Sequence, residues 1–273
     1  MKRVILIFVF LVWSLAQGMG FCLAANPQRE PDPEPEDYQL LRGIITAEFS
    51  GQVPHEWGES VSGVKTRLKT EDKVVALGVN ACDLMGKGQD ARLIKFLVAE
   101  KIPATLFICG EWIDKNTAAL KKLAANPLFE IANQGVSRRA CSVTGKAANG
   151  VPGTSNVEEL FAEIEQNARK IETITGILPQ YYYAGSGYYD EVAVRIVRAL
   201  GYEALGSSSR ASRGPSLEKK QVLDALANPA AGAIAILGGV SLQSSFVDSV
   251  MDAVRKLRSK GYKFVKVSDY PLE

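Results

Sequence analysis

Residues able to do chemistry cluster where the apolar runs of this chain end. Cys82 and Asp83 follow one such run, Cys109 ends the next, and Cys141 follows a third. A cysteine acts as a nucleophile only when a base or a cation lowers its pKa, and no histidine lies near these three in sequence. The only histidine in the chain, His55, precedes these three runs. We therefore expect the cysteines to be structural or inert rather than catalytic.

A single histidine also restricts metal and hydrolytic chemistry. A zinc site with two histidine ligands and a histidine acid cannot be built from it, and a Ser-His-Asp arrangement could use only His55. The glycine-containing segments at Gly86–Gly88 and Gly153–Ser155 fit neither a phosphate loop nor a dinucleotide fingerprint. The net charge of +2 argues against nucleic acid as a partner, because that needs a concentrated basic face.

The N-terminus has the layout of a secretory signal peptide over residues 1–25. Lys2 and Arg3 precede a short apolar run, and small residues lead to Ala24 and Ala25. We expect export, to the periplasm first and as a secreted protein second, with no stable membrane span after cleavage. An oxidising compartment permits a disulfide between Cys82 and Cys109, or between either of them and Cys141, with three free thiols as the alternative.

The mature chain divides into three parts. Residues 26–37 are rich in proline and acidic residues and are expected to form an exposed linker that cannot be helical. Residues 38–70 have an irregular pattern, which predicts a segment wrapped on the outside of the domain. Residues 71–273 are expected to form a single domain.

Within that domain, seven short apolar runs alternate with helical stretches. The clearest helix covers Asn156–Thr175, with Ser155 and Glu158 as a capping box and Gly176 at its end. Alternation of this kind predicts a parallel sheet with helical cover, closed or nearly closed as a barrel, with a doubly wound open sheet as the alternative. The predicted strands are Val74–Val79, Ala104–Cys109, Phe129–Ala132, Tyr181–Ala184, Ala204–Gly206, Ala233–Leu237 and Lys263–Val267. Further helices are expected at Asp90–Lys101, Lys115–Ala125, Asp190–Leu200, Leu217–Ala227 and Ser245–Lys260. In a parallel barrel the working residues lie at the C-terminal ends of the strands.

Four segments resemble blocks of the NodB-type polysaccharide deacetylases, carbohydrate esterase family 4. They read KVVALGVNACD, IPATLFICGEWID, NPLFEIANQGVSRRACSVTG and YYYAGSGYYDEVAVRIVRALG, and the first is closest to the branch with a T-F-D-A-C-G motif. The resemblance implies a distorted seven-stranded (β/α) barrel of the NodB/glycoside hydrolase-deacetylase type. It also implies metal-dependent hydrolysis of an acetyl group on a sugar, with a divalent metal such as zinc.

The family's working positions carry other residues here. Asn80 stands where the catalytic base is expected, and an amide cannot accept a proton near neutral pH. Gln134 and Arg138 stand at the two metal histidines, Tyr183 at the orienting arginine and Gly238 at the histidine acid. An amide is a poor zinc ligand and a guanidinium repels a metal. The resemblance therefore implies no catalytic residue and no metal or other cofactor in this chain.

We interpret the protein as a non-catalytic binder of a cell-envelope polysaccharide or peptidoglycan-type glycan. Two alternatives stay open: an active metal-dependent deacetylase with unrecognised ligands, and a regulatory or scaffold partner of an active deacetylase. Aromatic residues near the expected mouth could stack on sugar rings or simply pack; they are Trp112, Tyr181, Tyr182, Tyr183, Tyr188 and Tyr189. Of these, Trp112, Tyr183 and Tyr188 join Asn80, Asp83, Gln134 and Arg138 as predicted ligand-binding residues.

Arg138 admits more than one interpretation. Its guanidinium could stand near the family's metal position and pair with Asp83, or donate hydrogen bonds to Asn80 and Gln134. It could instead bind an anionic group of a sugar acid. A third interpretation is an arginine that points to solvent from a loop.

Overall fold

The computed structural model describes residues 34–84, 91–208, 226–237 and 244–273. The expected signal peptide, residues 26–33 of the expected linker and most of the expected helix Leu217–Ala227 lie outside this part. Residues Gln39–Glu273 form one compact unit. No helix among the described residues is long and apolar enough to cross a membrane.

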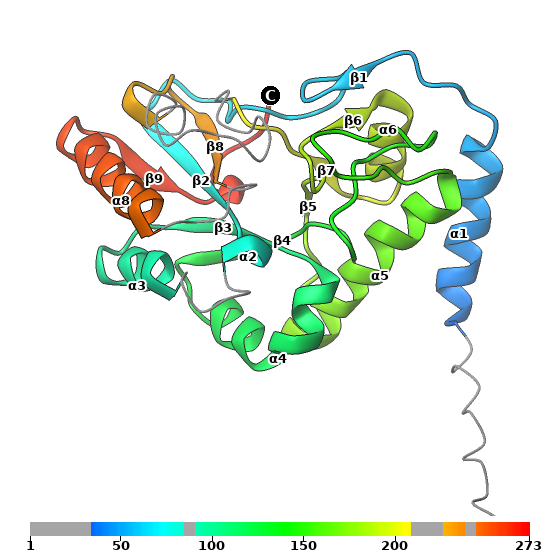
Figure 1. Ribbon diagram of the computed structural model, residues 1–273, viewed down its shortest axis with the longest axis horizontal. Helices are drawn as coiled ribbons and strands as arrows, with labels where there is room; N and C mark the ends of the chain where they lie inside the picture. Colours follow the sequence, from blue (N-terminus) through cyan, green and yellow to red (C-terminus); the bar gives the residue numbers. More distant parts are fainter. Residues whose placement is uncertain (1–33, 85–90, 209–225, 238–243) are drawn as a thin grey trace, which may run out of the picture. The chain divides into compact units, whose positions relative to one another are not determined.

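Seven strands form one curled sheet, and every pairing within it is parallel. The strands run in the order β7-β5-β4-β3-β2-β8, and β9 also pairs with β2 (Figure 1). They are β2 (Val74–Asn80), β3 (Ala104–Ile108), β4 (Phe129–Asn133), β5 (Tyr181–Tyr182), β7 (Glu203–Ala204), β8 (Ala233–Leu237) and β9 (Lys263–Val265). Each lies within or overlaps one of the seven runs predicted from the sequence, so the predicted α/β barrel is confirmed.

The described helices are α1 (Glu36–Phe49), α2 (Ala81–Leu84), α3 (Ala91–Ala99), α4 (Gly110–Ala124), α5 (Val157–Thr175), α6 (Glu191–Ala199) and α8 (Ser244–Ser259), with a 3-10 turn, η2 (Val267–Asp269). Of these, α3, α4 and α8, with Ile171 of α5, pack against the outer face of the sheet (Figure 1). A separate two-stranded sheet pairs β1 (Trp57–Gly58) with β6 (Tyr189–Asp190).

Alternation along the strands divides the core in two. In β2, Val75, Leu77 and Val79 pack against the helices, whereas Val74 and Ala76 face the barrel interior with the side chains of the opposite strands. Because β2 is buried on both faces, it appears in the sequence as an unbroken apolar run.

The barrel is closed by an inserted segment rather than by a strand pair. Lys65 donates its backbone N–H to the carbonyl of Ala204 at β7 (2.8 Å), and Leu68 donates to Gly232 beside β8 (2.8 Å). Ser208 adds a direct bond to Ile234 of β8 (3.0 Å). The end of the segment that we expected to wrap on the outside therefore fills the gap between the two edge strands.

Two local predictions were wrong. The N-cap of α5 is Asn156, whose side chain accepts from Glu159, not Ser155; Gly176 ends the helix in the left-handed conformation as predicted. The segment from Glu36 to Phe49 is helical, whereas we expected it to be irregular, with a non-helical linker up to 37. Tyr38, Ile45 and Phe49 are its buried positions, and Gly43 in the middle weakened this pattern in the sequence.

Candidate functional site at the barrel mouth

Three predicted site residues lie at the C-terminal ends of strands in one sheet, in which β3 separates β2 from β4 and β5 adjoins β4. Asn80 is the last residue of β2, Gln134 follows β4, and Tyr183 follows β5. The register aligns these ends, because Gln134 donates its N–H to Ile108 of β3 (3.0 Å) and Tyr183 donates to Asn133 of β4 (2.9 Å). The alternation of Val74, Ala76 and Asn80 on β2 places the asparagine on the interior side, as it does Gln134 and Tyr183 on their strands. We call these three residues the mouth triad.

Three amide atoms of the mouth triad are buried without hydrogen-bond partners. Asn80 is 3% exposed and its Oδ1 has no partner, and Gln134 is 0% exposed with neither Oε1 nor Nε2 bonded. An unmatched buried polar group costs about 1–3 kcal/mol of stability. Such groups call for an explanation, and a polar ligand supplies one.

Apolar side chains fill the barrel beneath the mouth triad. The rings of Phe107 and Tyr183 lie 5.1 Å apart, centroid to centroid. A Cβ added at Gly78 would come within 2.8 Å of Phe107 and 2.9 Å of Ile236, so glycine is required where these side chains meet. The polar groups of the mouth therefore stand on a packed apolar floor, and the barrel is not a pore.

The loop that follows β4 starts from a buried hydrogen-bonded asparagine. Asn133 donates its side-chain amide to the carbonyl of Ile164 (2.9 Å), and its Oδ1 accepts from the N–H of Gly135 (2.8 Å) and from Asn167 (2.7 Å). Two of these contacts come from α5. The helix thus fixes the direction in which the chain leaves β4, immediately before Gln134.

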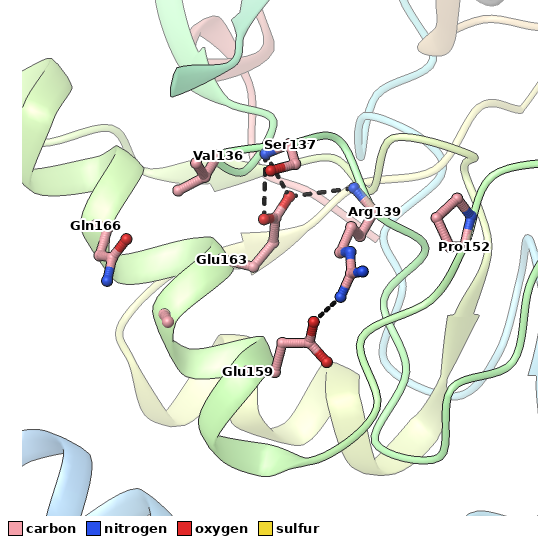
Figure 2. Close-up of a pocket in the computed structure, with 8 residues that line it drawn as sticks. Val136, Ser137, Arg139, Pro152, Glu159, Glu163 and Gln166 are labelled. Carbon is pink, nitrogen blue, oxygen red and sulfur yellow. Dashed lines mark hydrogen bonds and ion pairs between the residues drawn. The ribbon is translucent and has the colours of Figure 1, made fainter. Parts of the chain in front are cut away.

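Glu163 of α5 holds the rest of this loop (Figure 2). Its carboxylate accepts the backbone N–H of Ser137 (3.0 and 3.1 Å) and of Arg139 (3.1 Å), and its own carbonyl accepts from Val136 (3.0 Å). Gly135 has φ +79°, and a Cβ there would lie 2.3 Å from the Glu163 carboxylate. Sequence reasoning missed Glu163; the available signal was a charged residue on the apolar side of α5, between Leu160 and Ile164.

Burial raises the pKa of Glu163, which is 6% exposed, against the opposing effect of the amides of Arg139 and Ser137. The neighbouring Arg139 side chain forms an ion pair with Glu159, one turn earlier on α5. These groups line a pocket of about 460 Å³ on the outer side of the loop, which Figure 2 shows. The loop from Gln134 to Arg139 is therefore supported from behind by α5.

The other predicted ligand-binding residues do not all reach the mouth. Trp112, 5% exposed, packs in the core between sheet and helices, with its Nε1 unbonded. Arg138 is partly exposed and has a left-handed backbone (φ +61°), close against Gly185. The side chain of Asp83 and all of Gly238 lie outside the described part, so the predicted Asp83–Arg138 pair stays a prediction. The interpretation in which Arg138 donates hydrogen bonds to the side-chain oxygens of Asn80 and Gln134 is wrong, because neither oxygen has a partner.

Of the six aromatic residues expected near the mouth, only Tyr188 is partly exposed. Tyr189 is fully buried, and its hydroxyl donates to Leu205 (2.7 Å) and accepts from Ala184 (2.7 Å). Burial, and then the nearby Cys141, raise its pKa well above the usual range. Tyr189 is therefore a packing residue whose hydroxyl links the backbone at Ala184 to the backbone at Leu205.

The structure shows which cysteines pair and which one is free. Cys82, after β2, and Cys109, after β3, form a disulfide with Cα atoms 6.1 Å apart. Cys141 is free and fully buried, and burial, followed by the charges of Asp190 and Glu163, raises its thiol pKa well above normal. A buried thiol with a raised pKa is a poor nucleophile. The alternative of a cysteine-based enzyme therefore has no support in the site.

The residues present do not fit the divalent metal that this fold would imply. Across residues 34–84, 91–208, 226–237 and 244–273, no group of three or more His, Cys, Asp or Glu side chains is placed to hold a metal ion. At the mouth the available atoms are amides, which are poor zinc ligands. We derive no metal-dependent step from this site.

A curled parallel barrel with its polar site at the strand ends is the architecture of carbohydrate esterase family 4. A wild-type pseudoenzyme of that family from Bacillus anthracis matches at TM-score 0.57 and 18% identity, over 73% of this chain and 65% of that one. The chain thus spans about two thirds of that protein's length. A family 4 carbohydrate esterase from Bacillus anthracis matches at TM-score 0.60 and 20% identity, over 80% and 96% of the two chains. A peptidoglycan N-acetylglucosamine deacetylase matches at 0.63 and 18%, over 77% and 92%.

The TM-scores show a shared fold, and at these sequence identities they show nothing beyond the fold. The sequence model of the polysaccharide deacetylase family matches residues 67–205, half of the chain. The chain therefore belongs to the polysaccharide deacetylase family. No curated protein matches it.

Proposed function

We propose that this protein binds an N-acetylated cell-envelope glycan without hydrolysing it. The observation that carries the proposal is the set of three buried, unbonded amide atoms at the mouth, Oδ1 of Asn80 and both polar atoms of Gln134. An acetamido group has one N–H donor and one carbonyl acceptor. Asn80 Oδ1 can accept from the first and Gln134 Nε2 can donate to the second.

The same residues argue against hydrolysis. An amide at position 80 cannot take a proton from water near neutral pH. Gln134 and Arg138 occupy the positions at which the resemblance implies metal histidines, and neither is suited to hold a cation. One similar structure is itself described as a pseudoenzyme. A mutant of that protein is described as having restored enzymatic activity, so that relative keeps a fold that can support the reaction.

The test compares two ligands by isothermal titration calorimetry. We expect an N-acetylated chito-oligosaccharide to bind at least about tenfold more tightly than its deacetylated counterpart, because loss of hydrogen bonds to buried polar groups costs about 1–3 kcal/mol. Gln134→Ala is expected to remove this preference. Gln166→Ala, an exposed glutamine on α5, is the matched control and is expected to keep it. Equal binding of both ligands would refute acetamido recognition.

We also propose that the chain is exported by cleavage of residues 1–25 and works in the periplasm. The proposal rests on the basic start, short apolar run and small-residue end of this segment. Mass spectrometry of the protein from a periplasmic fraction is expected to find a mature N-terminus near Asn26. Full-length protein in the cytosolic fraction would contradict it.

A further inference from the structure

Three side chains form a partly exposed group that the acetamido contacts proposed above do not use. The rings of Trp57 and Tyr188 lie 5.8 Å apart, centroid to centroid, and are tilted by 44°. The ammonium of Lys146 lies 5.8 Å from the centroid of the Trp57 ring. Both rings are partly exposed and Lys146 is exposed. We call this group the aromatic pair and its lysine; it joins three segments that are far apart in the sequence.

The backbone holds Trp57 in place from two sides. Strand β1 pairs with β6 so that Trp57 lies opposite Asp190 (Figure 1). The carboxylate of Glu191 accepts the backbone N–H of His55 (2.7 Å) and of Glu56 (2.7 Å). Burial alone would raise the pKa of Glu191, but these amides outweigh it and the pKa is lowered. The segment carrying Trp57 is therefore fixed, although its ring is left partly open.

The aromatic pair adjoins the mouth triad. A Cβ added at Gly187 would come within 2.8 Å of the Tyr183 hydroxyl, so the chain passes directly against the mouth tyrosine before it reaches Tyr188. The carbonyl of Tyr188 accepts the N–H of Cys141 (3.0 Å), which fixes its backbone. A ligand that extends outward past Tyr183 therefore meets Tyr188 and Trp57.

We propose that Trp57 and Tyr188 form a stacking subsite for a second sugar ring of the bound glycan, with Lys146 donating a hydrogen bond to that ring. Partly exposed aromatic faces suit the C–H faces of sugars, and a nearby donor fixes orientation. Trp57 lies outside residues 67–205, the part that matches the family, and the subsite is thus an addition made by the N-terminal segment. The inference rests on the proposed glycan binding and extends it from one sugar to a chain.

The experiment measures binding of N-acetylglucosamine and of N-acetylated chitotetraose by isothermal titration calorimetry. We expect the wild-type protein to bind the tetrasaccharide about tenfold more tightly than the monosaccharide. Trp57→Ala and Tyr188→Ala are each expected to remove most of this gain, and the double variant to add little, because the two rings act on one sugar. Affinity for the monosaccharide is expected to stay unchanged.

Matched variants guard against effects on folding. Tyr270→Ala removes a partly exposed aromatic residue near Asp72, before the start of β2, and is expected to keep the gain. Lys146→Ala changes only an exposed side chain, and we expect it to weaken tetrasaccharide binding about threefold. If Trp57→Ala, Tyr188→Ala and Lys146→Ala all bind the tetrasaccharide as the wild type does, the subsite is wrong while the proposed function stands. If the wild type binds neither sugar, both fail.

Discussion

Three buried amide atoms at the mouth of the barrel lack hydrogen-bond partners, whereas Asn133 and Glu163, behind the loop that follows β4, have them. Behind the loop, Asn133 and Glu163 meet backbone groups at 2.8–3.1 Å. At the mouth, Asn80 and Gln134 are equally buried and leave three polar atoms unbonded. The contacts of Asn133 and Glu163 support the loop that follows β4. The two residues at the mouth, by contrast, carry amide atoms that no such contacts satisfy. On the function proposed above, this chain keeps the fold of the deacetylases and recognises an acetamido group at the mouth without hydrolysing it.

The largest effect is expected from a variant that exchanges the two amides and Arg138 for an acid and two imidazoles. The variant Asn80→Asp, Gln134→His, Arg138→His places a carboxylate at the position of the base and imidazoles at the positions of the two metal histidines that the resemblance implies. We expect it to bind zinc more tightly than the wild type, since imidazole is a good zinc ligand and an amide or a guanidinium is not. Metal analysis by mass spectrometry after dialysis gives the stoichiometry, with the wild type expected to retain none.

A matched control tests whether the support matters. The same three substitutions combined with Glu163→Ala are expected to bind zinc more weakly, because the loop between positions 134 and 139 loses its carboxylate contact. Wild-type protein that holds stoichiometric zinc would show that this chain has ligands we have not identified.

The next largest effect is expected from the disulfide that joins the ends of β2 and β3. Cys82→Ala with Cys109→Ala opens a cross-link over 27 residues, and we expect the free energy of unfolding to fall by about 3 kcal/mol. Urea unfolding with and without reductant measures it. Reductant should lower the stability of the wild type to that of the variant and leave the variant unchanged. Equal stability of both proteins without reductant would mean that the cross-link does not form.

Glu163 gives a pH-dependent test of the support. Its pKa is raised in the folded chain, so the folded state binds more protons there than the unfolded state. The stabilisation is therefore complete below the ordinary pKa of 4.5 and is lost as the pH rises through the folded pKa. We expect Glu163→Gln to cost about 2 kcal/mol at acidic pH and less toward neutral pH, by urea unfolding across this range. A deficit that grows with pH would contradict the raised pKa.

The smallest expected effect is a gain. Gln134→Leu removes two unbonded polar atoms from a fully buried site, and we expect the free energy of unfolding to rise by about 1 kcal/mol while glycan affinity falls. Thermal unfolding and calorimetric titration measure the two changes. Asn133→Leu is the matched control; its amide is fully bonded, and its loss is expected to destabilise the chain. If Gln134→Leu is also destabilising, the amide has a structural role.

The sequence was sufficient to predict the barrel, because strands buried on both faces and amphipathic helices leave clear periodic signals. Strands β2, β3 and β8 lie within a residue of their predicted bounds. Helix α4 begins at Gly110, five residues before the prediction, since Gly110 and Asn116 weaken the pattern there. Closure by residues 65–68 depends on bonds to Ala204 and Gly232, which no local pattern encodes.

The site was predictable only where it follows the strand ends. Asn80, Gln134 and Tyr183 were identified from the family motifs in which they replace other residues, and a parallel barrel brings the strand ends that carry them to one side. Trp57 was not found, since its partner Tyr188 lies 131 residues further along the chain. The disulfide partners could not be chosen among the cysteines, since the choice depends on the distance between Cα atoms.

One measurement tests both parts of the proposed function, recognition of an acetamido group and the absence of its hydrolysis. Proton NMR of an N-acetylated chito-oligosaccharide follows its acetyl methyl signals as protein is added and over the hours that follow. We predict broadening or shifts that saturate, that weaken with Gln134→Ala, and no free acetate. Acetate that accumulates in proportion to the amount of protein would contradict binding without hydrolysis and would show that this chain is a deacetylase.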